Sequence, residues 1–296
     1  MIGGGLIGPV LVTGGSGFLG GALCAALAAS GETVIAADLG DISVRPPDVA
    51  YERCDILEAE ALYGMCERHG VRAIVHLAAM VIPACKANPR AGAEVNIIGH
   101  LNLLEVARRL SVPRFLYTSS IAAKPRGTLD SPVNLYGAYK RCCEDISKIY
   151  YLDHGQASIG LRPNVVYGPG REHGETAAIT LAIKAAALRE RYEMPFAGAL
   201  CMQHVDEVVD VMIRCLRAEH DGALVSDITT GAQTLDELIA VIRDIEPDAD
   251  IMPSRNQRPS PPVLDNSPLL ALIGDWPGVS LEDGVARTFR YYRGTD

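Results

Sequence analysis

A tyrosine and a lysine four residues apart form the pair best suited to acid/base chemistry in this sequence. Tyr136 and Lys140 lie in a stretch that predicts a helix over residues 134–154, where positions i and i+4 share one face. A phenol titrates at about pH 10 in water, and a neighbouring ammonium group favours its phenolate form. The pair therefore predicts proton transfer to or from a secondary alcohol. The alternative, an ordinary surface pair on an amphipathic helix, is disfavoured when a nucleotide site accompanies it.

Two serines follow a predicted strand and add hydroxyl groups to this chemistry. Residues 114–118 read as a strand, and Ser119 and Ser120 come directly after it. We expect Ser120 to hydrogen-bond the reacting oxygen, with Ser119 as the second choice. A serine that only caps a turn at the strand end is the competing interpretation.

A glycine-rich segment, residues 13–20, lies between an apolar run and an alanine-rich helical pattern. Gly14, Gly17 and Gly20 lack the side chains that would keep a backbone away from a pyrophosphate, and the amides of the helix start can donate to it. The spacing G-x-x-G-x-x-G departs from the general G-x-G-x-x-G fingerprint, so a flexible turn is the alternative for the motif alone. The order strand, turn, helix favours a dinucleotide-binding loop.

An acid at the end of the next predicted strand supports this interpretation. Asp38 lies 24 residues after Gly14, near the spacing at which a carboxylate meets the adenosine ribose. It would accept hydrogen bonds from both ribose hydroxyls and repel a 2′-phosphate, so NAD is favoured over NADP. Arg45 is the counterargument, because its basic side chain could reach a phosphate. A solvated loop acid beside Asp41 is the other interpretation.

Strand-like runs alternate with helical patterns through the first 160 residues. The expected strands are 9–13, 33–37, 49–53, 72–77, 114–118 and 157–161, and the expected helices are 17–29, 58–68, 89–110 and 134–154. This alternation predicts an α/β fold: a Rossmann-type doubly wound parallel sheet with helices on both faces. Ligands of such sheets bind at the carboxyl ends of the strands.

The pattern changes after Arg162, where irregular, Pro- and Gly-containing segments separate expected helices at 176–191, 205–218 and 234–245. We expect residues 1–161 to form the NAD-binding domain, with 205–228 returning to it as a helix and a strand. Residues 162–204 and 229–296 would form a small C-terminal substrate-binding lobe.

The composition is that of a globular, acidic chain. Of 296 residues, 48% are hydrophobic and 21% charged, with a formal net charge of -9. The apolar content allows a large core, and the negative charge argues against nucleic-acid binding. We expect no membrane association, because no apolar stretch has the length of a span, and hence a cytoplasmic protein. The eight cysteines include no C-x-x-C pair, so buried reduced thiols and no metal site are expected.

Beyond single motifs, the chain resembles the extended short-chain dehydrogenase/reductase family, the epimerase/dehydratase group with NAD on a Rossmann fold. The glycine spacing found here is that family's form. The segments that carry the resemblance span nearly the whole chain: 13–20, 38, 55–56, 76–79, 96–104, 118–120, 136–140, 161–163, 167–169, 204–208 and 276–284.

The resemblance implies NAD as the cofactor and assigns its contacts by position. The backbone amides of Phe18 and Leu19 would meet the pyrophosphate, and Asp55 and Ile56 would border the adenine. The other cofactor residues that it implies are Gly14, Gly17, Gly20, Asp38, Leu77, Ala78, Ala79, Asn96, Tyr136, Lys140 and Pro163.

The resemblance also implies the catalytic roles. Tyr136 would be the acid/base, Lys140 would bind the nicotinamide ribose and favour the phenolate, and Ser120 would orient the substrate oxygen. Candidate substrate contacts are Asn164, Arg171 and His173, and the last two could equally be solvated loop residues. Helices over 89–110 and 134–154 would pair across a two-fold axis in a homodimer.

Departures from the family pattern narrow the reaction. Dehydratases of the family resemble one another in an Asp-Glu pair after the catalytic Ser or Thr, whereas Ile121 and Ala122 follow Ser120, so dehydration is not expected. Nucleotide-sugar epimerases typically carry Asn where this chain has Val165, and few residues separate Gly170 from His204. A smaller substrate therefore fits better.

Three functions are compatible with the sequence. The first is an NAD-dependent dehydrogenase or reductase that transfers hydride at a secondary alcohol or ketone of a small polar substrate, such as a sugar, sugar acid or polyol. The second is a nucleotide-sugar 4-epimerase of the UDP-glucose type with tightly bound NAD. The third is a catalytically silent NAD-sensing protein, against which the intact Ser120, Tyr136 and Lys140 argue.

Overall fold

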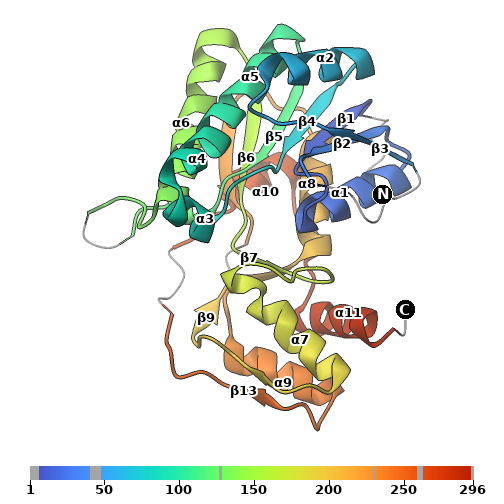
Figure 1. Ribbon diagram of the computed structural model, residues 1–296, viewed down its shortest axis with the longest axis vertical. Helices are drawn as coiled ribbons and strands as arrows, with labels where there is room; N and C mark the ends of the chain where they lie inside the picture. Colours follow the sequence, from blue (N-terminus) through green and yellow to red (C-terminus); the bar gives the residue numbers. More distant parts are fainter. Residues whose placement is uncertain (1–6, 41–47, 127–128, 230, 259–262, 295–296) are drawn as a thin grey trace. The chain divides into compact units, whose positions relative to one another are not determined.

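The computed structural model describes residues 7–40, 48–126, 129–229, 231–258 and 263–294, and the chain divides into two compact units (Figure 1). The first unit comprises Met1–Arg162, Val209–Asp227 and Ser267–Gly274, and the second comprises Pro163–Val208, Ile228–Asn266 and Asp275–Asp296. The sequence pattern predicts that all of 229–296 belongs to the small lobe. Ser267–Gly274 instead clusters with the first unit, because the helix α10 (Ser267–Ile273) packs against a strand of its sheet.

A seven-stranded sheet forms the centre of the first unit, with the order β11-β6-β5-β4-β1-β2-β3 and parallel pairing throughout. Its strands are β1 (Val10–Thr13), β2 (Val34–Asp38), β3 (Val49–Arg53), β4 (Ala73–His76), β5 (Arg114–Thr118), β6 (Ser158–Arg162) and β11 (Ala223–Asp227). The strand order reverses between β1 and β4, and ligands of such sheets bind at the carboxyl ends next to that switch point. The predicted Rossmann-type fold is confirmed.

Helices cover the sheet because its central strands are apolar on both faces. Val10, Leu11, Val12, Ile74 and Val75 are all fully buried, as expected for parallel strands between two helical layers. The main helices of this unit, seen in Figure 1, are α1 (Phe18–Ala29), α2 (Ala59–His69), α5 (Gly99–Arg109) and α6 (Leu135–His154). The helix α8 (Val205–Arg217) begins in the second unit and continues into the first.

The helix expected over 89–110 is interrupted. It consists of α4 (Pro89–Ala93), a π-helical turn at Glu94–Ile98, and α5, and a short helix α3 (Ile82–Ala87) precedes it. The π turn lodges one extra residue in the helix, and such turns are frequent at functional sites. The periodicity of apolar residues did not reveal it.

The second unit has a core of three helices and short strand pairs. The helices are α7 (Ala178–Leu188), α9 (Leu235–Ile245) and α11 (Leu281–Arg293), and buried side chains from all three belong to one cluster. The short strands are β7 (Val165–Tyr167), β8 (Tyr192–Glu193), β9 (Ala199–Leu200), β10 (Met202–His204), β12 (Gln233–Thr234) and β13 (Ile251–Met252). Gly284 of α11 allows close packing, because a Cβ there would lie 2.1 Å from the Tyr167 hydroxyl.

Within the ranges that the structure describes, no helix is both long enough and apolar enough to cross a bilayer.

Candidate functional site

The glycine loop between β1 and α1 is a tight turn that side chains would disrupt. Gly14 has a φ of +71°, and its amide donates to the Ala37 carbonyl at 2.9 Å. A Cβ on Gly14 would lie 2.7 Å from the backbone nitrogen of Ala78, and one on Gly20 would lie 2.1 Å from the Gly14 carbonyl oxygen. Glycine at these two positions is therefore a steric requirement of the turn.

The start of α1 presents its backbone amides without competition from an acidic side chain. Gly17 is the N-cap and has no side chain to cap the helix, and the first turn, from Phe18, contains no Asp or Glu. The N-terminal amides and the positive end of the helix dipole favour an anion. The chemistry of this turn fits a pyrophosphate near Phe18 and Leu19.

A cavity of about 300 Å³ lies beside this loop. Because its walls come from the ends of β1, β2, β3 and β4, it occupies the carboxyl edge of the sheet. Of the predicted cofactor residues, those that line it are Gly14, Gly17, Asp38, Asp55, Ile56, Leu77, Ala78 and Ala79. The structure thus brings together residues that span 65 positions in the sequence, and the cavity fits the adenosine end of a dinucleotide.

Asp38 ends β2 and faces the glycine loop. Its Oδ2 accepts hydrogen bonds from the Ser16 amide at 3.0 Å and from the Ser16 hydroxyl, and its Oδ1 accepts from the Leu39 amide at 2.7 Å. These donors fix the carboxylate at the cavity wall, where the sequence had placed a ribose contact. Arg45, the basic side chain that could favour NADP, lies outside the described residues.

The cavity wall formed by Asp55 and Ile56 is held from α5. Asp55 Oδ1 accepts from the Leu57 amide at 2.9 Å, and Asn102 Nδ2 donates to the Ile56 carbonyl at 2.9 Å. Gly99 allows the helix to approach, since a Cβ there would lie 2.4 Å from Ile56 Cδ1. Asn102 therefore positions this turn without lining the cavity.

Two buried histidines lie beneath the loop. His76 Nδ1 is 2.9 Å from the Thr13 hydroxyl, and its ring centroid is 5.4 Å from that of His100, whose Nε2 is 2.9 Å from the Ser147 hydroxyl. Burial lowers the pKa of His76 well below its usual range and that of His100 to about 3. Both rings are consequently neutral at pH 7.

Asn96 lies in the π-helical turn and is almost fully buried. Its Nδ2 donates to the carbonyls of Met80 at 3.0 Å and Gly92 at 2.9 Å, and its backbone carbonyl accepts from the Cys143 thiol. Among the described residues, its Oδ1 has no hydrogen-bond partner. Its neighbour Val95 lines the cavity, so the predicted residue supports the cavity wall and does not line it.

Tyr136 and Lys140 share one face of α6, as their spacing predicts. The Lys140 ammonium lies 5.7 Å from the centroid of the Tyr136 ring and donates to the Thr118 carbonyl at 2.7 Å. Lys140 is 4% exposed, whereas Tyr136 is half-buried. Burial lowers the pKa of Lys140. The strand end at Thr118 and the helix α6 together fix the ammonium beside the phenol.

Ser119 and Ser120, which follow β5, differ in surroundings. The Ser119 side chain is buried and donates to Glu144 of α6. Ser120 is half-buried and is the N-cap of a short 3-10 helix, Ile121–Ala123, where its Oγ accepts from the Ala122 amide at 3.1 Å. Ser120 is thus the more accessible of the two hydroxyls, and it caps the turn, which was the competing interpretation.

The predicted residues beyond Arg162 belong to the second unit. Pro163 and Asn164 precede β7, and Arg171 and His173 lie in the loop before α7. That loop is anchored by α11, because the Gly170 amide donates to the Tyr292 hydroxyl at 3.0 Å. Pro163 is not among the residues that line the 300 Å³ cavity.

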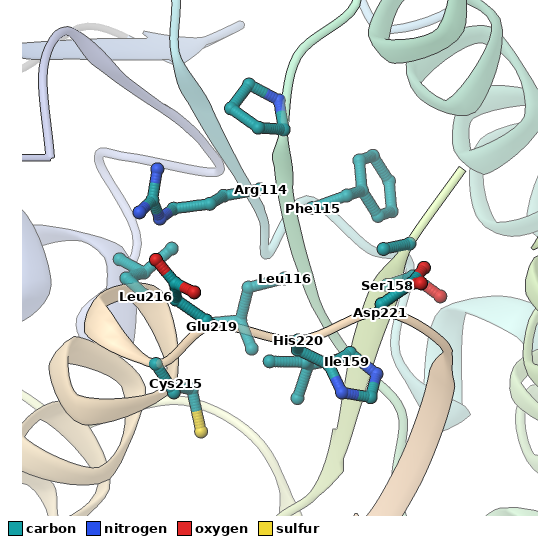
Figure 2. Close-up of a pocket in the computed structure, with 13 residues that line it drawn as sticks. Arg114, Phe115, Leu116, Ser158, Ile159, Cys215, Leu216, Glu219, His220 and Asp221 are labelled. Carbon is teal, nitrogen blue, oxygen red and sulfur yellow. The ribbon is translucent and has the colours of Figure 1, made fainter. Parts of the chain in front are cut away.

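A second cavity of about 460 Å³ lies at the other edge of the sheet, where β5 and β6 begin (Figure 2). Arg114, Leu116, Ile159 and Glu219 are among the side chains drawn around it. None of the predicted site residues is among the described residues that line it. Its position at the amino ends of the strands separates it from the residues that could do chemistry.

Several residues that line the 300 Å³ cavity are absent from the set predicted from the sequence. Leu39 and Cys54 line it as the direct neighbours of Asp38 and Asp55, so their positions at strand ends were an available signal. Ser16, a polar residue within the glycine loop, was a signal for the contact with Asp38. Val95 had no local signal, because the π turn that orients it is not visible in the sequence.

Comparisons with known proteins identify the family of this chain. A family model described as the NAD dependent epimerase/dehydratase family matches residues 10–227. A UDP-glucose 4-epimerase of Mycolicibacterium smegmatis is 27% identical over 96% of this chain and 98% of its own length, and one of Rhizobium meliloti is 30% identical over 80% and 81%.

Solved structures share the fold. The UDP-glucose 4-epimerase of Thermotoga maritima superposes with a TM-score of 0.85 at 24% identity, covering 97% of this chain and 99% of that one. An L-threonine dehydrogenase of Cupriavidus necator gives 0.86 at 24% identity, covering 96% and 99%. The chain thus contains the glycine loop, the cavity at the switch point and the Tyr-Lys pair. It belongs to the NAD-dependent epimerase/dehydratase family of extended short-chain dehydrogenases/reductases.

Proposed function

We propose that this protein is an NAD-dependent oxidoreductase that transfers hydride at a secondary alcohol or ketone of a small sugar, sugar-acid or polyol-like substrate. The observation that carries the proposal is the buried ammonium of Lys140, which is held on the Thr118 carbonyl and lies 5.7 Å from the Tyr136 ring centroid. A cation this close stabilises a phenolate in a partly dry environment. This is the arrangement that proton abstraction from an alcohol needs.

The roles of the residues follow from their chemistry. Tyr136 would take the hydroxyl proton as the carbinol carbon is oxidised, and return it in the reverse direction. Ser120 would donate its hydroxyl hydrogen to the substrate oxygen and hold it near the phenol. NAD, when bound, supplies the acceptor for the hydride. Lys140 would keep the phenolate accessible and hydrogen-bond the ribose.

A small substrate is supported by the side chain at position 165. Val165 begins β7, is 3% exposed, and belongs to the apolar core of the second unit. It has no polar atom to hold a nucleotide diphosphate at the position where epimerases of the family carry Asn. Asn164 lies one residue earlier in the sequence, so it does not align with that family position.

A 4-epimerase is the second candidate. The observation in its favour is that two relatives with broad coverage, at 27% and 30% identity, are UDP-glucose 4-epimerases. In that reaction bound NAD would be reduced and reoxidised within one turnover, with the same roles for Tyr136 and Ser120. The proposed dehydrogenase would release net NADH, whereas the epimerase would not, so net NADH distinguishes the two candidates.

A substrate screen tests the proposal directly. The protein is incubated with NAD and a panel of sugars, aldonates, polyols and UDP-sugars, while NADH absorbance and isomer composition are followed together. We expect NADH to accumulate with a small polar substrate. Interconversion of UDP-sugars without net NADH would establish the epimerase instead, and NAD binding with no turnover of any compound would favour the sensor.

The Tyr136→Phe variant tests the mechanism. We expect it to lower kcat by a factor of about 100 or more, since general acid/base catalysis contributes roughly that much, with NAD affinity retained. Tyr139→Phe is the matched control, because Tyr139 lies on the same helix but donates to the Pro89 carbonyl at 2.8 Å. A wild-type kcat in Tyr136→Phe would overturn the assignment.

A further inference from the structure

The segment that carries Ser120 is held at three points by charged side chains from other elements. Lys140 donates to the Thr118 carbonyl at 2.7 Å, and the Ser119 hydroxyl donates to Glu144. At the other end of the segment, Lys124 Nζ donates to Asp227 Oδ2 at 2.5 Å. Thr118 to Lys124 is therefore anchored on both sides of Ser120.

One arginine connects the two carboxylates of these anchors. Arg162, at the end of β6, donates from Nε and Nη2 to the two oxygens of Glu144 at 2.7 and 2.5 Å. Its Nη1 lies 3.7 Å from Asp227 Oδ1. Glu144 and Asp227 are 0% and 1% exposed, so both carboxylates depend on these partners for compensation. The network ties the carboxyl ends of β5, β6 and β11 to α6.

The charge balance indicates what this network can do. Its two carboxylates, Glu144 and Asp227, face two cations, Arg162 and Lys124, so the four side chains are neutral together. A neutral, mutually paired cluster offers no excess charge for an anionic substrate. The network instead fixes the orientation of its side chains, because buried bidentate pairs hold defined geometries.

A single helical turn links Lys124 to Ser120. Ser120 is the N-cap of the 3-10 helix and Lys124 its C-cap, with the Ala123 amide donating to the Ser120 carbonyl at 3.0 Å. This turn packs closely against the start of α6, since a Cβ on Gly137 would lie 2.1 Å from the Ala122 carbonyl oxygen. A displacement of Lys124 is thus transmitted to Ser120, beside the helix that carries Tyr136.

We propose that Lys124 and Asp227 are positioning residues that hold the Ser120 hydroxyl in its productive orientation through this 3-10 turn. The inference rests on the proposed function of Ser120. It predicts that loss of the Lys124–Asp227 pair lowers kcat. The two residues are far apart in the sequence, and neither contributes a group to the reaction.

The Lys124→Met variant tests this, because Lys124 is 19% exposed and its removal disturbs the fold less than removal of a fully buried carboxylate would. With the substrate found by the screen, we expect kcat to fall about tenfold, with KM and the Kd for NAD each changed less than twofold. Lys124→Arg should restore most of kcat, because a guanidinium can still pair with Asp227. Lys148→Met is the matched control, since Lys148 pairs with Asp145 at the exposed surface of α6.

A double-mutant cycle with Ser120→Ala separates positioning from a general loss of structure. If Lys124 acts through Ser120, Lys124→Met should lower kcat less than twofold in the Ser120→Ala background. An equal tenfold loss in both backgrounds, or no loss in either, would overturn the inference. If Ser120→Ala and Tyr136→Phe both retain full turnover, the proposed function fails first.

Hydrogen exchange in the NAD-loaded protein supplies a readout that needs no substrate. We expect amides of residues 119–124 to exchange at least tenfold faster in Lys124→Met, while those of β1 and β4 remain unchanged. Unchanged protection of residues 119–124 would contradict the proposed anchoring even if no substrate had been found.

Discussion

The carboxylate of Asp38 is fixed where it would discriminate between two dinucleotides. The amides of Ser16 and Leu39 and the Ser16 hydroxyl hold it at the cavity wall. In the proposed binding mode, a 2′-phosphate on the adenosine ribose would approach this charge, and the repulsion would disfavour NADP. The proposed preference for NAD would therefore depend on one side chain and the loop that orients it.

We expect Asp38→Ala to lower the ratio of the NADP to the NAD dissociation constant by a factor of about ten, equivalent to about 1.4 kcal/mol. Titration of each dinucleotide against protein fluorescence measures both constants. Asp48→Ala is the control, since Asp48 is an exposed acid just before β3. An unchanged ratio in Asp38→Ala would refute the ribose assignment.

The βα turn at the start of α1 requires that Gly14 and Gly20 have no Cβ atom. A Cβ at Gly20 would lie 2.1 Å from the Gly14 carbonyl oxygen, whereas one at the neighbouring Gly21 meets nothing closer than 3.9 Å. Backbone atoms cannot move aside as a flexible side chain can. The loop must shift if Gly20 gains a methyl group, and its amides then leave their positions at the cavity.

We expect Gly20→Ala to lower the free energy of unfolding by about 1–3 kcal/mol and to weaken NAD binding at least tenfold. Gly21→Ala should leave NAD binding unchanged and stabilise the helix slightly, because alanine favours helix over glycine. Thermal unfolding and NAD titration of the two variants measure this difference. Equal behaviour of the two would show that the turn tolerates the side chain.

The sequence predicted those elements whose environment is uniform along their length. Strands β1 and β4 are buried on both faces, so their apolar runs are unambiguous. The π turn at Glu94–Ile98 was not predictable, since one inserted residue changes hydrogen bonding without changing composition. The helix α11 was missed because its exposed face is strongly charged, and its N-cap Ser280 is the signal that could have identified it.

Within the site, the sequence predicted only those relations between residues that follow from regular secondary structure. Spacing alone placed Tyr136 beside Lys140 and aligned Asp38 with the glycine loop, because both relations follow from regular secondary structure. The contacts of Ser119 with Glu144 and of Lys124 with Asp227 could not be predicted, because they join β5 and its following turn to α6 and β11. Such contacts depend on the assembled sheet.

At the scale of the whole molecule, the two units carry acid-sensitive groups of different kinds. The first contains His76 and His100, whose pKa values burial lowers from about 6.5 in the unfolded chain. The second contains Asp206, whose pKa the His204 ring and the Arg287 guanidinium lower to about 2. The stabilisation from Asp206 is present above the unfolded pKa of an aspartate, about 4, and is lost only as pH falls below it.

The histidines act in a higher pH range. Because their folded pKa values are depressed, the unfolded chain binds protons first as pH falls below about 6.5, and stability decreases from there toward pH 3. At pH 5, a His whose pKa is about 3 in the fold has lost about 2 kcal/mol of stabilisation. We therefore expect the free energy of unfolding, from urea titrations followed by circular dichroism, to fall between pH 6.5 and 5. That fall precedes the protonation of Asp206.

Replacement of one ring separates this contribution from that of other groups. His100→Gln keeps a donor and an acceptor near Ser147 but cannot gain a proton, so the loss of stability between pH 6.5 and 5 should decrease by about half. His154→Gln, at the exposed C-terminal end of α6, should retain the full loss. The same pH dependence in both variants would mean that protonation of His100 does not destabilise the fold. The neutral histidine pair beneath the glycine loop would then not determine the pH at which the fold begins to lose stability.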